Sequence, residues 1–294
     1  MNVLIFGSNG FLGKELNQLL KTANHSTYTV SRSKDDAAFK VDISNSKDFE
    51  NLPLNFFDVV INCATVLPGG DYLDNDFLDR IYKTNILGTQ NICKWIEGQN
   101  TIRKIINCST LAVVKKPWPI ELNENVNTYP TGRHVLYSFS KLGQELLFDT
   151  FANFNDIIVS HVRFSALYGK NMISSGIITN IIDQIKKTNN IQLTNASKVN
   201  ADFLYVEDAA RIIAALIENN FDGVINGATG TETSILQLAE IIKKNFKDQS
   251  IKILNTEDQN FLEDRAVICI ENLKKIIDIN TFSSLEEGIK KMIS

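Results

Sequence analysis

Short apolar runs rich in β-branched and aromatic residues alternate with longer amphipathic segments through the first half of this chain. The apolar runs are Val3–Phe6, Tyr28–Val30, Val59–Ile61, Ile105–Ile106 and Ile157–Val162, and the segments with helical periodicity are Phe11–Leu20, Asp76–Ile96 and Leu136–Phe151. Strands that alternate with helices are typical of parallel sheets covered by helices on both faces. The pattern therefore predicts an α/β fold with a doubly wound parallel sheet. Ligands of such sheets bind beyond the carboxyl ends of the strands, so functional residues are expected in the loops that follow them.

The composition argues against several classes of function. With 44% hydrophobic and 22% charged residues, the chain has the balance of a globular protein. Its formal net charge of -4 offers no basic surface for nucleic acid or an anionic membrane. The apolar runs are too short for a membrane span, and the first strand begins too close to Met1 for a signal peptide, so we expect a cytoplasmic protein. The four cysteines lack Cys-x-x-Cys spacing, and no metal site is predicted.

A glycine-rich turn follows the first apolar run and leads directly into the first helical segment. Its glycines have the spacing Gly-x-x-Gly-x-x-Gly. Glycine permits a tight turn and lets backbone N–H groups approach a pyrophosphate at a helix N-terminus. We therefore interpret the turn as the phosphate-binding loop of a Rossmann-type domain rather than as a simple helix–strand contact. The predicted cofactor contacts in it are Gly7, Asn9, Gly10, Phe11, Leu12 and Gly13.

The end of the second strand bears on the choice of dinucleotide. An acidic residue there would bind the ribose 2′-hydroxyl of NAD, but this strand leads into Ser31 and Arg32. A neutral residue followed by arginine suits a 2′-phosphate, so NADP is favoured and NAD is the alternative; Arg32 could also be only a solvated charge. Asp42, which precedes Ile43, is interpreted either as an acceptor for the adenine amino group or as the cap of the next helix.

A tyrosine and a lysine lie on successive turns of the predicted helix Leu136–Phe151. Tyr137 and Lys141 share one helical face because they are four residues apart. A phenol with a pKa of about 10 is a poor base at neutral pH, but a nearby ammonium and an oxidised nicotinamide favour its ionised form. The pair is therefore the predicted catalytic centre, although this spacing also occurs on ordinary surface helices.

Polar residues near two other strand ends complete the predicted site. Hydroxyls at the end of the predicted strand Ile105–Cys108 could bind a substrate oxygen or cap a turn, and the backbone after Val59–Ile61 could lie beneath the nicotinamide ribose. An asparagine also interrupts the core-facing helix Asp76–Ile96. The residues in question are Ser109, Thr110, Cys63, Ala64, Thr65 and Asn85.

The sequence changes character in its second half, after Tyr168-Gly169. We predict a dinucleotide-binding domain over residues 1–166 and a smaller C-terminal substrate-binding lobe over residues 167–294. Within the lobe, residues 203–226 could return to pack on the first domain. A capped helix is expected at Ser283–Ile293.

Taken together, these motifs resemble the extended short-chain dehydrogenase/reductase family, in particular its nucleotide-sugar epimerases, dehydratases and 4-keto reductases. The resemblance covers nearly the whole chain and includes the segments Arg163–Gly169, Asp202–Asp208 and Gly223–Ala228. It implies that Tyr137 is the acid/base and that Lys141 binds the nicotinamide ribose and lowers the tyrosine pKa. It also implies that Thr110, with Ser109 beside it, binds the substrate, that Arg265 binds its diphosphate, and that a homodimer forms through the two long helices.

One departure from the family pattern narrows the expected reaction. Leu111 and Ala112 occupy the positions of the Asp-Glu pair with which sugar 4,6-dehydratases expel a hydroxyl, so dehydration is disfavoured. Together with Arg32, this favours an NADPH-dependent 4-keto-6-deoxysugar reductase. The alternatives are a nucleotide-sugar 4-epimerase with tightly held NAD, a reductase of a small carbonyl compound, and a non-catalytic NADP sensor.

Overall fold

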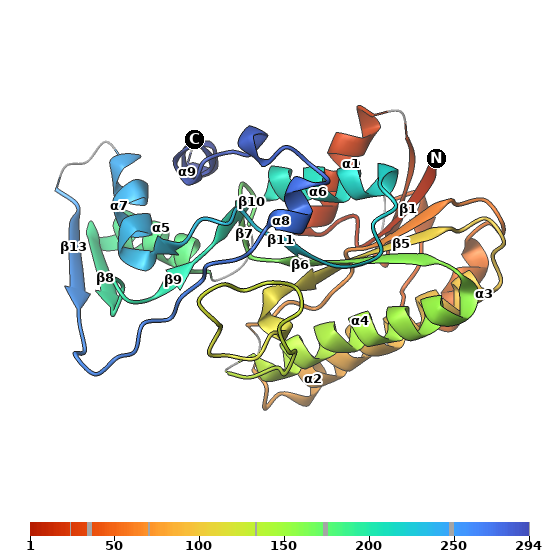
Figure 1. Ribbon diagram of the computed structural model, residues 1–294, viewed down its shortest axis with the longest axis horizontal. Coiled ribbons are helices and arrows are strands. Elements are labelled where there is room, and N and C mark those ends of the chain that lie inside the picture. Colours follow the sequence, from red (N-terminus) through yellow and green to blue (C-terminus); the bar gives the residue numbers. More distant parts are fainter. Residues whose placement is uncertain are drawn as a thin grey trace.

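The computed structural model describes residues 1–23, 25–33, 37–69, 71–132, 134–172, 176–246 and 250–293. At its centre is a seven-stranded sheet in which every neighbouring pair of strands is parallel (Figure 1). In spatial order its strands are β11 (Gly223–Gly227), β6 (Ile158–Phe164), β5 (Lys104–Thr110), β4 (Val59–Asn62), β1 (Asn2–Phe6), β2 (Ser26–Ser31) and β3 (Phe39–Lys40). The order β3-β2-β1-β4-β5-β6 is that of the Rossmann fold, so the predicted fold class is confirmed.

Helices cover both faces of this sheet (Figure 1). On one face lie α1 (Phe11–Lys21) and α6 (Val206–Glu218), and on the other lie α3 (Gly88–Glu97) and α4 (Val135–Asn155). Alternate side chains of each strand point to opposite faces. Val3 and Ile5 accordingly pack with α1 and α6, whereas Leu4 and Phe6 pack with α3 and α4. Burial on both faces explains why the strands appear in the sequence as continuous apolar runs.

The segment predicted as one helix over Asp76–Ile96 is helical but not uniform. It consists of α2 (Asn75–Ile81), the π-helix η2 (Tyr82–Leu87) and α3. A π-turn accommodates an extra residue without ending the helix, and it shifts the face on which the following side chains lie. An apolar pattern does not reveal such a turn, because the helical repeat resumes after it.

The remaining elements lie mainly in the C-terminal half. Small two-stranded sheets pair β7 (Ala166–Tyr168) with β10 (Phe203–Tyr205), β9 (Asn200–Ala201) with β12 (Thr233–Ser234), and β8 (Asn190–Thr194) with β13 (Lys252–Thr256). The other helices are η1 (Ser46–Asn51), η3 (Leu111–Val113), α5 (Ile177–Thr188), α7 (Ile235–Lys244), α8 (Glu271–Lys274), η4 (Ile279–Thr281) and α9 (Leu285–Ile293). None of the described helices is both long and apolar enough to cross a lipid bilayer.

The C-terminal half contributes to more than one apolar cluster. Helices α5, α7 and α9 bury Ile181, Leu238 and Ile289 in a cluster of their own, which also holds parts of β8 and β10. By contrast, β11 pairs with β6, and α6 packs against α1 in the apolar cluster that also holds Val3 and Ile5. The boundary at residue 166 stays a prediction.

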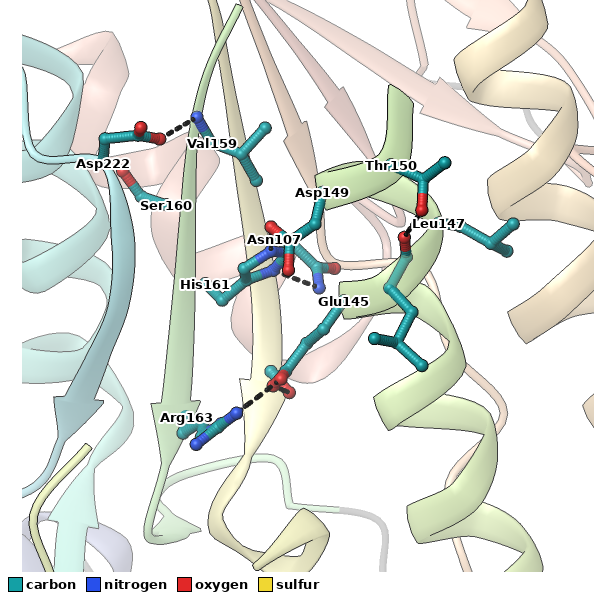
Figure 2. A network of polar contacts seen from close by, with 12 residues as sticks. Asn107, Glu145, Leu147, Asp149, Thr150, Val159, Ser160, His161, Arg163 and Asp222 are labelled. Carbon is teal, nitrogen blue, oxygen red and sulfur yellow. Dashed lines mark hydrogen bonds and ion pairs between the residues drawn. The ribbon is translucent and has the colours of Figure 1, made fainter. Parts of the chain in front are cut away.

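Three buried polar side chains cross the main sheet at one level. Asn62, Asn107 and His161 are register partners on β4, β5 and β6, and each is 0% exposed. The Asn62 amide donates to Asn107 Oδ1. The Asn107 amide donates to His161 Nδ1, and His161 Nε2 donates to Asp149 Oδ1 on α4 (Figure 2). At the other end, Asn62 Oδ1 accepts from the backbone N–H of Ala64 at 3.2 Å. This polar ladder therefore connects the loop after β4 with α4.

A buried carboxylate fastens the chain where it leaves the main sheet. Asp202 is 2% exposed and accepts hydrogen bonds from Thr229 N (3.0 Å), Thr229 Oγ1 (2.9 Å), Thr231 N (3.1 Å) and Ser165 Oγ (2.8 Å). It holds the turn after β11 against the residue that follows β6. The four donors compensate in part for the removal of the carboxylate from water, and burial still raises the pKa of Asp202 above its ordinary value.

Replacing Asp202 with alanine is expected to lower the free energy of unfolding by about 2–4 kcal/mol, because several buried donors lose their acceptor. Urea denaturation measures this loss. Asp222→Ala is the matched control, because the exposed Asp222 accepts one hydrogen bond, from Val159 N at 2.9 Å. Equal losses in the two variants would contradict the role assigned to Asp202.

Candidate active site

The glycine turn after β1 leaves no room for side chains. Gly7 has φ +76°, and a Cβ there would lie 2.6 Å from the backbone nitrogen of Ala64. A Cβ on Gly13 would lie 2.2 Å from the carbonyl oxygen of Gly7. Gly10 is the N-cap of α1 and provides no side-chain cap, so the N–H groups of the first turn are available to an external anion. This cradle fits a dinucleotide pyrophosphate.

The glycine turn is linked to the end of β2. Asn9 Nδ2 donates to Ser31 Oγ at 3.0 Å, and Ser8 Oγ donates to the carbonyl of Val30 at 3.0 Å. Ser31 is buried, whereas Arg32 is exposed at the start of the following loop. The structure therefore brings the predicted phosphate loop and the predicted ribose-binding residues together.

Asp42 and Ile43 lie after β3. The Asp42 carboxylate accepts from Ser44 N at 2.9 Å and from Ser44 Oγ at 2.7 Å, so it caps a turn. The helix that follows, η1, is instead capped by Asn45, which corrects one of the two interpretations of Asp42. The Ile43 side chain is in the core and lies against Gly88. A Cβ on Gly88 would be 2.7 Å from Ile43 Cδ1. Like Leu12, Ile43 has a side chain committed to packing.

One face of α4 carries four ionisable residues at four-residue intervals: Tyr137, Lys141, Glu145 and Asp149. Residues spaced in this way lie above one another on a helix. Lys141 and Glu145 are 2% and 3% exposed, and Tyr137 is half-buried. The predicted catalytic pair is thus the first half of a longer polar stripe.

Burial shifts the pKa of both members of the pair. Burial raises the pKa of Tyr137 above its ordinary value, and neighbouring Tyr72 adds to the effect. The lowering of this pKa by Lys141 together with a bound oxidised nicotinamide stays a prediction. Burial also lowers the pKa of Lys141 to about 8, against opposing contributions from Cys108, Glu145 and Cys63.

The two hydroxyls at the end of β5 have different surroundings. Ser109 Oγ donates to Glu145 Oε1, and the same carboxylate is bound by Arg163 through Nε at 3.1 Å and Nη2 at 2.7 Å (Figure 2). Thr110 Oγ1 accepts from Ala112 N at 3.2 Å, and this leaves its own proton available to a ligand. Ser109 therefore attaches β5 to α4, and Thr110 is the hydroxyl suited to a substrate oxygen.

The loop after β4 lies between the glycine turn and α4. Cys63 N donates to the carbonyl of Phe6 at 2.9 Å, and its Sγ lies 3.4 Å from Sγ of Cys108. Thr65 Oγ1 donates to the carbonyl of Val66 at 3.3 Å. Asn85, from the π-helix, accepts from Val66 N at 2.8 Å. Its amide also donates to Ser140 Oγ of α4 at 2.8 Å, so Asn85 joins this loop to α4.

Arg265 lies in a segment next to the loop after η3, since its neighbour Asp264 binds Lys116 Nζ at 2.7 Å. The guanidinium of Arg265 is engaged by Glu232, with Nε 2.8 Å from Oε1 and Nη2 2.7 Å from Oε2. Its charge is thus largely compensated within the protein. A substrate diphosphate would have to compete with Glu232 for this arginine.

Sequence reasoning left Gln144 and Tyr72 unmentioned and gave Glu145 and Arg163 no role. Glu145 carried a usable signal, because a carboxylate four residues after Lys141 falls on the same helical face. A groove elsewhere on the surface contains none of the predicted site residues; it is lined by Ser46, Lys47, Phe49, Glu50, Leu52, Leu54, Asn91, Lys94 and Trp95.

Comparison with known proteins identifies relatives of this chain. A family model described as "NAD dependent epimerase/dehydratase family" matches residues 3–228. The chain is 23% identical over 295 residues to the UDP-glucuronate 4-epimerase of Thermodesulfobacterium geofontis, covering 95% of this chain and 81% of the relative. It is 25% identical over 255 residues to the GDP-6-deoxy-D-talose 4-dehydrogenase of Aggregatibacter actinomycetemcomitans, covering 82% and 79%.

Solved structures share the fold. UDP-glucuronic acid 4-epimerase from Bacillus cereus, in complex with NAD, superposes with a TM-score of 0.79 at 22% identity, covering 99% of this chain and 94% of that one. RMD from Pseudomonas aeruginosa, complexed with NADPH, gives a TM-score of 0.80 at 19% identity, covering 99% and 97%. A nicotinamide dinucleotide therefore occurs in this fold in both its NAD and its NADP forms.

Replacing Gly13 with alanine is expected to weaken dinucleotide binding by about tenfold or more, because the added Cβ collides with the Gly7 carbonyl and displaces the turn. Titration of the protein with NADH and NADPH, followed by fluorescence, measures the change. Gly98→Ala serves as the control, since its Cβ would be 3.7 Å from the nearest atom. Unaltered affinity in Gly13→Ala would exclude the turn as the pyrophosphate site.

Proposed function

The chain belongs to the NAD dependent epimerase/dehydratase family, and we propose that it acts at C4 of a nucleotide-linked sugar, with 4-epimerisation as the net reaction. The observation that carries the proposal is the position of Tyr137 and Lys141 on α4. They share the helical face that the bond between Ser109 and Glu145 attaches to the end of β5, and Thr110 is the next residue of that strand. Oxidation and reduction at one carbon need a proton-transferring group, a hydroxyl that binds the substrate oxygen, and a bound nicotinamide.

The relatives support this reaction better than the reductase favoured by the sequence. One matched relative and one solved structure are named 4-epimerases, and the 4-dehydrogenase of a 6-deoxysugar is also named for position 4. Leu111 and Ala112 follow Thr110 in η3, where neither side chain can transfer a proton. The site therefore suits removal and return of hydrogen at one carbon rather than loss of a hydroxyl.

Each residue receives a role in this proposal. Tyr137 takes the proton of the C4 hydroxyl and returns a proton to the ketone, while Thr110 donates a hydrogen bond to the same oxygen. Lys141 binds the nicotinamide ribose and, by its charge, favours the ionised phenol. When bound, the nicotinamide accepts and returns the hydride.

Further contacts with the dinucleotide are assigned to residues at the carboxyl edge of the sheet. Backbone groups of the glycine turn would hold the pyrophosphate, Ser31 and Arg32 the adenosine ribose, Asp42 and Ile43 the adenine, and the loop after β4 the nicotinamide ribose. The residues assigned are Gly7, Asn9, Gly10, Phe11, Leu12, Gly13, Ser31, Arg32, Asp42, Ile43, Cys63, Ala64, Thr65 and Asn85.

A 4-keto-6-deoxysugar reductase is the second candidate, and the end of β2 favours it. The position where an acidic residue would select NAD holds Ser31, whose hydroxyl accepts from Asn9, and the exposed Arg32 follows. Arginine suits the 2′-phosphate of NADPH, which a reductase consumes from solution. An epimerase, in contrast, needs no external reductant.

Tyr137→Phe is expected to leave dinucleotide affinity unchanged and to reduce turnover by about 10²–10⁴-fold, because the proton-transferring hydroxyl is lost. UDP-glucuronic acid and UDP-galactose, without added reductant, test 4-epimerisation by NMR of the product; a GDP-4-keto-6-deoxysugar with NADPH tests reduction. Tyr129→Phe is the matched control, since Tyr129 is 65% exposed. Full turnover in Tyr137→Phe would overturn the mechanism, and NADPH consumption without epimerisation would favour the reductase.

We also propose a cytoplasmic homodimer formed through the exposed side of α2, η2 and α4. Large apolar side chains are exposed there, a feature that marks interaction surfaces. They are Tyr82 (54%), Leu87 (40%), Phe139 (47%) and Leu146 (57%). The four cysteines are free thiols, as expected in a reducing compartment.

Leu146→Glu is expected to convert this dimer to a monomer, because two copies of a carboxylate would be buried near the symmetry axis. Light scattering coupled to gel filtration measures the mass. Leu254→Glu, at a residue that is 53% exposed on β13, controls for a general effect of surface charge. A wild-type protein that is monomeric at micromolar concentration would refute the dimer.

A further inference from the structure

The ammonium of Lys141 is buried and directed at a neighbour on its own helix. Lys141 Nζ donates to Gln144 Oε1, one turn further along α4. Gln144 is 0% exposed, and a glutamine at such a position is unusual unless its carboxamide is fully bonded. Its contacts therefore need an explanation beyond packing.

The other end of the carboxamide is fixed by the helix opposite. Gln144 Nε2 donates to Thr89 Oγ1 at 3.0 Å, and Thr89 Oγ1 in turn donates to the carbonyl of Asn85 at 2.8 Å. Because the Thr89 proton is already used, its oxygen can only accept from Gln144. The amide nitrogen must then face Thr89, and the amide oxygen must face Lys141.

This contact is part of a repeated arrangement between two helices. Asn85 pairs with Ser140 and Thr89 pairs with Gln144, so the partners are four residues apart on each side. The first pair fixes the loop after β4 through Val66, and the second fixes the lysine. The two together define where α4 lies relative to the π-helix.

We propose that Gln144 is a positioning residue, which holds the Lys141 ammonium in a fixed direction while leaving it free of an ion pair. An ammonium has three N–H donors, so one bond to Gln144 leaves two for the ribose hydroxyls of a dinucleotide. The inference rests on the function proposed above only for the identity of the group that Lys141 binds.

The charges around Lys141 explain why a neutral acceptor matters. Burial lowers the pKa of Lys141 to about 8, and the Glu145 carboxylate on α4, with the thiols of Cys108 on β5 and Cys63 after β4, acts in the opposite direction. The Glu145 carboxylate is itself engaged by Arg163 and Ser109. A carboxylate at position 144 would bind the ammonium as an ion pair, whereas an apolar residue would leave one N–H without its acceptor.

Two substitutions at this position should therefore act in opposite directions. In the cofactor-free protein, labelled with ¹³C at the lysine Cε, the Lys141 signal is assigned by its loss in Lys141→Met and titrated by NMR. We expect Gln144→Leu to lower the Lys141 pKa by about one unit and Gln144→Glu to raise it by at least as much. The alkaline limb of kcat/KM should shift in the same directions.

Gln99→Leu is the matched control, because Gln99 is also a buried glutamine with two hydrogen bonds, to Asn55 N and the Trp95 carbonyl. It should lower the melting temperature without moving the Lys141 pKa. If Gln144→Leu does not fold, the upward shift of the Lys141 pKa in Gln144→Glu is by itself the test of the proposal. An unchanged Lys141 pKa, or shifts of one sign in both variants, would overturn it.

Failure of the proposed function can be told apart from failure of this inference. The NMR titration needs neither dinucleotide nor sugar, so opposite pKa shifts support Gln144 even if no nucleotide sugar is a substrate. Conversely, epimerisation that depends on Tyr137 together with an unshifted Lys141 pKa would leave the function in place and remove the role of Gln144.

Discussion

Parallel pairing of the seven strands is the constraint on which the rest of the molecule depends. It brings the carboxyl ends of β1, β4 and β5 to one edge, so the glycine turn, the loop after β4 and Thr110 meet although they are far apart in the sequence. The strand order reverses between β1 and β4. At this point the backbone of Gly7 lies so close to Ala64 that no side chain fits between them.

The second half of the site depends on how α4 lies against this edge. The polar residues on one face of α4 bind polar residues of the neighbouring strands. Arg163 and Ser109 bind Glu145, and His161 binds Asp149. Buried charges such as Glu145 and Arg163 are destabilising unless they are paired and hydrogen-bonded. The pairing also has a geometric result, because Ser109 attaches α4 to β5, the strand that carries Thr110, whereas Arg163 and His161 attach it to β6.

Local patterns were enough to predict the fold, and they also indicated a candidate catalytic pair, whose role stays a prediction. The apolar runs, the glycine spacing and the pair Tyr137 and Lys141 each lie within one element, and the strands and helices were found there. Features that depend on contacts between distant elements were not predictable. The strand Ile105–Cys108 was predicted, but the partners of the polar residues Asn107 and Ser109 were not, because they come from β4, β6 and α4. The contact of Gln144 with Thr89 was missed because it joins two distant helices. The π-helix was missed because the helical repeat resumes after it.

The polar ladder across β4, β5 and β6 has a consequence for how the chain reaches this structure. A slip of one residue between two of these strands would turn every side chain to the opposite face. Asn62, Asn107 and His161 would then lose their partners inside apolar surroundings, at a cost of about 1–3 kcal/mol each. Apolar side chains would tolerate such a slip far better. The ladder therefore disfavours misaligned pairing of β4, β5 and β6, and with it misplacement of the loops at their carboxyl ends.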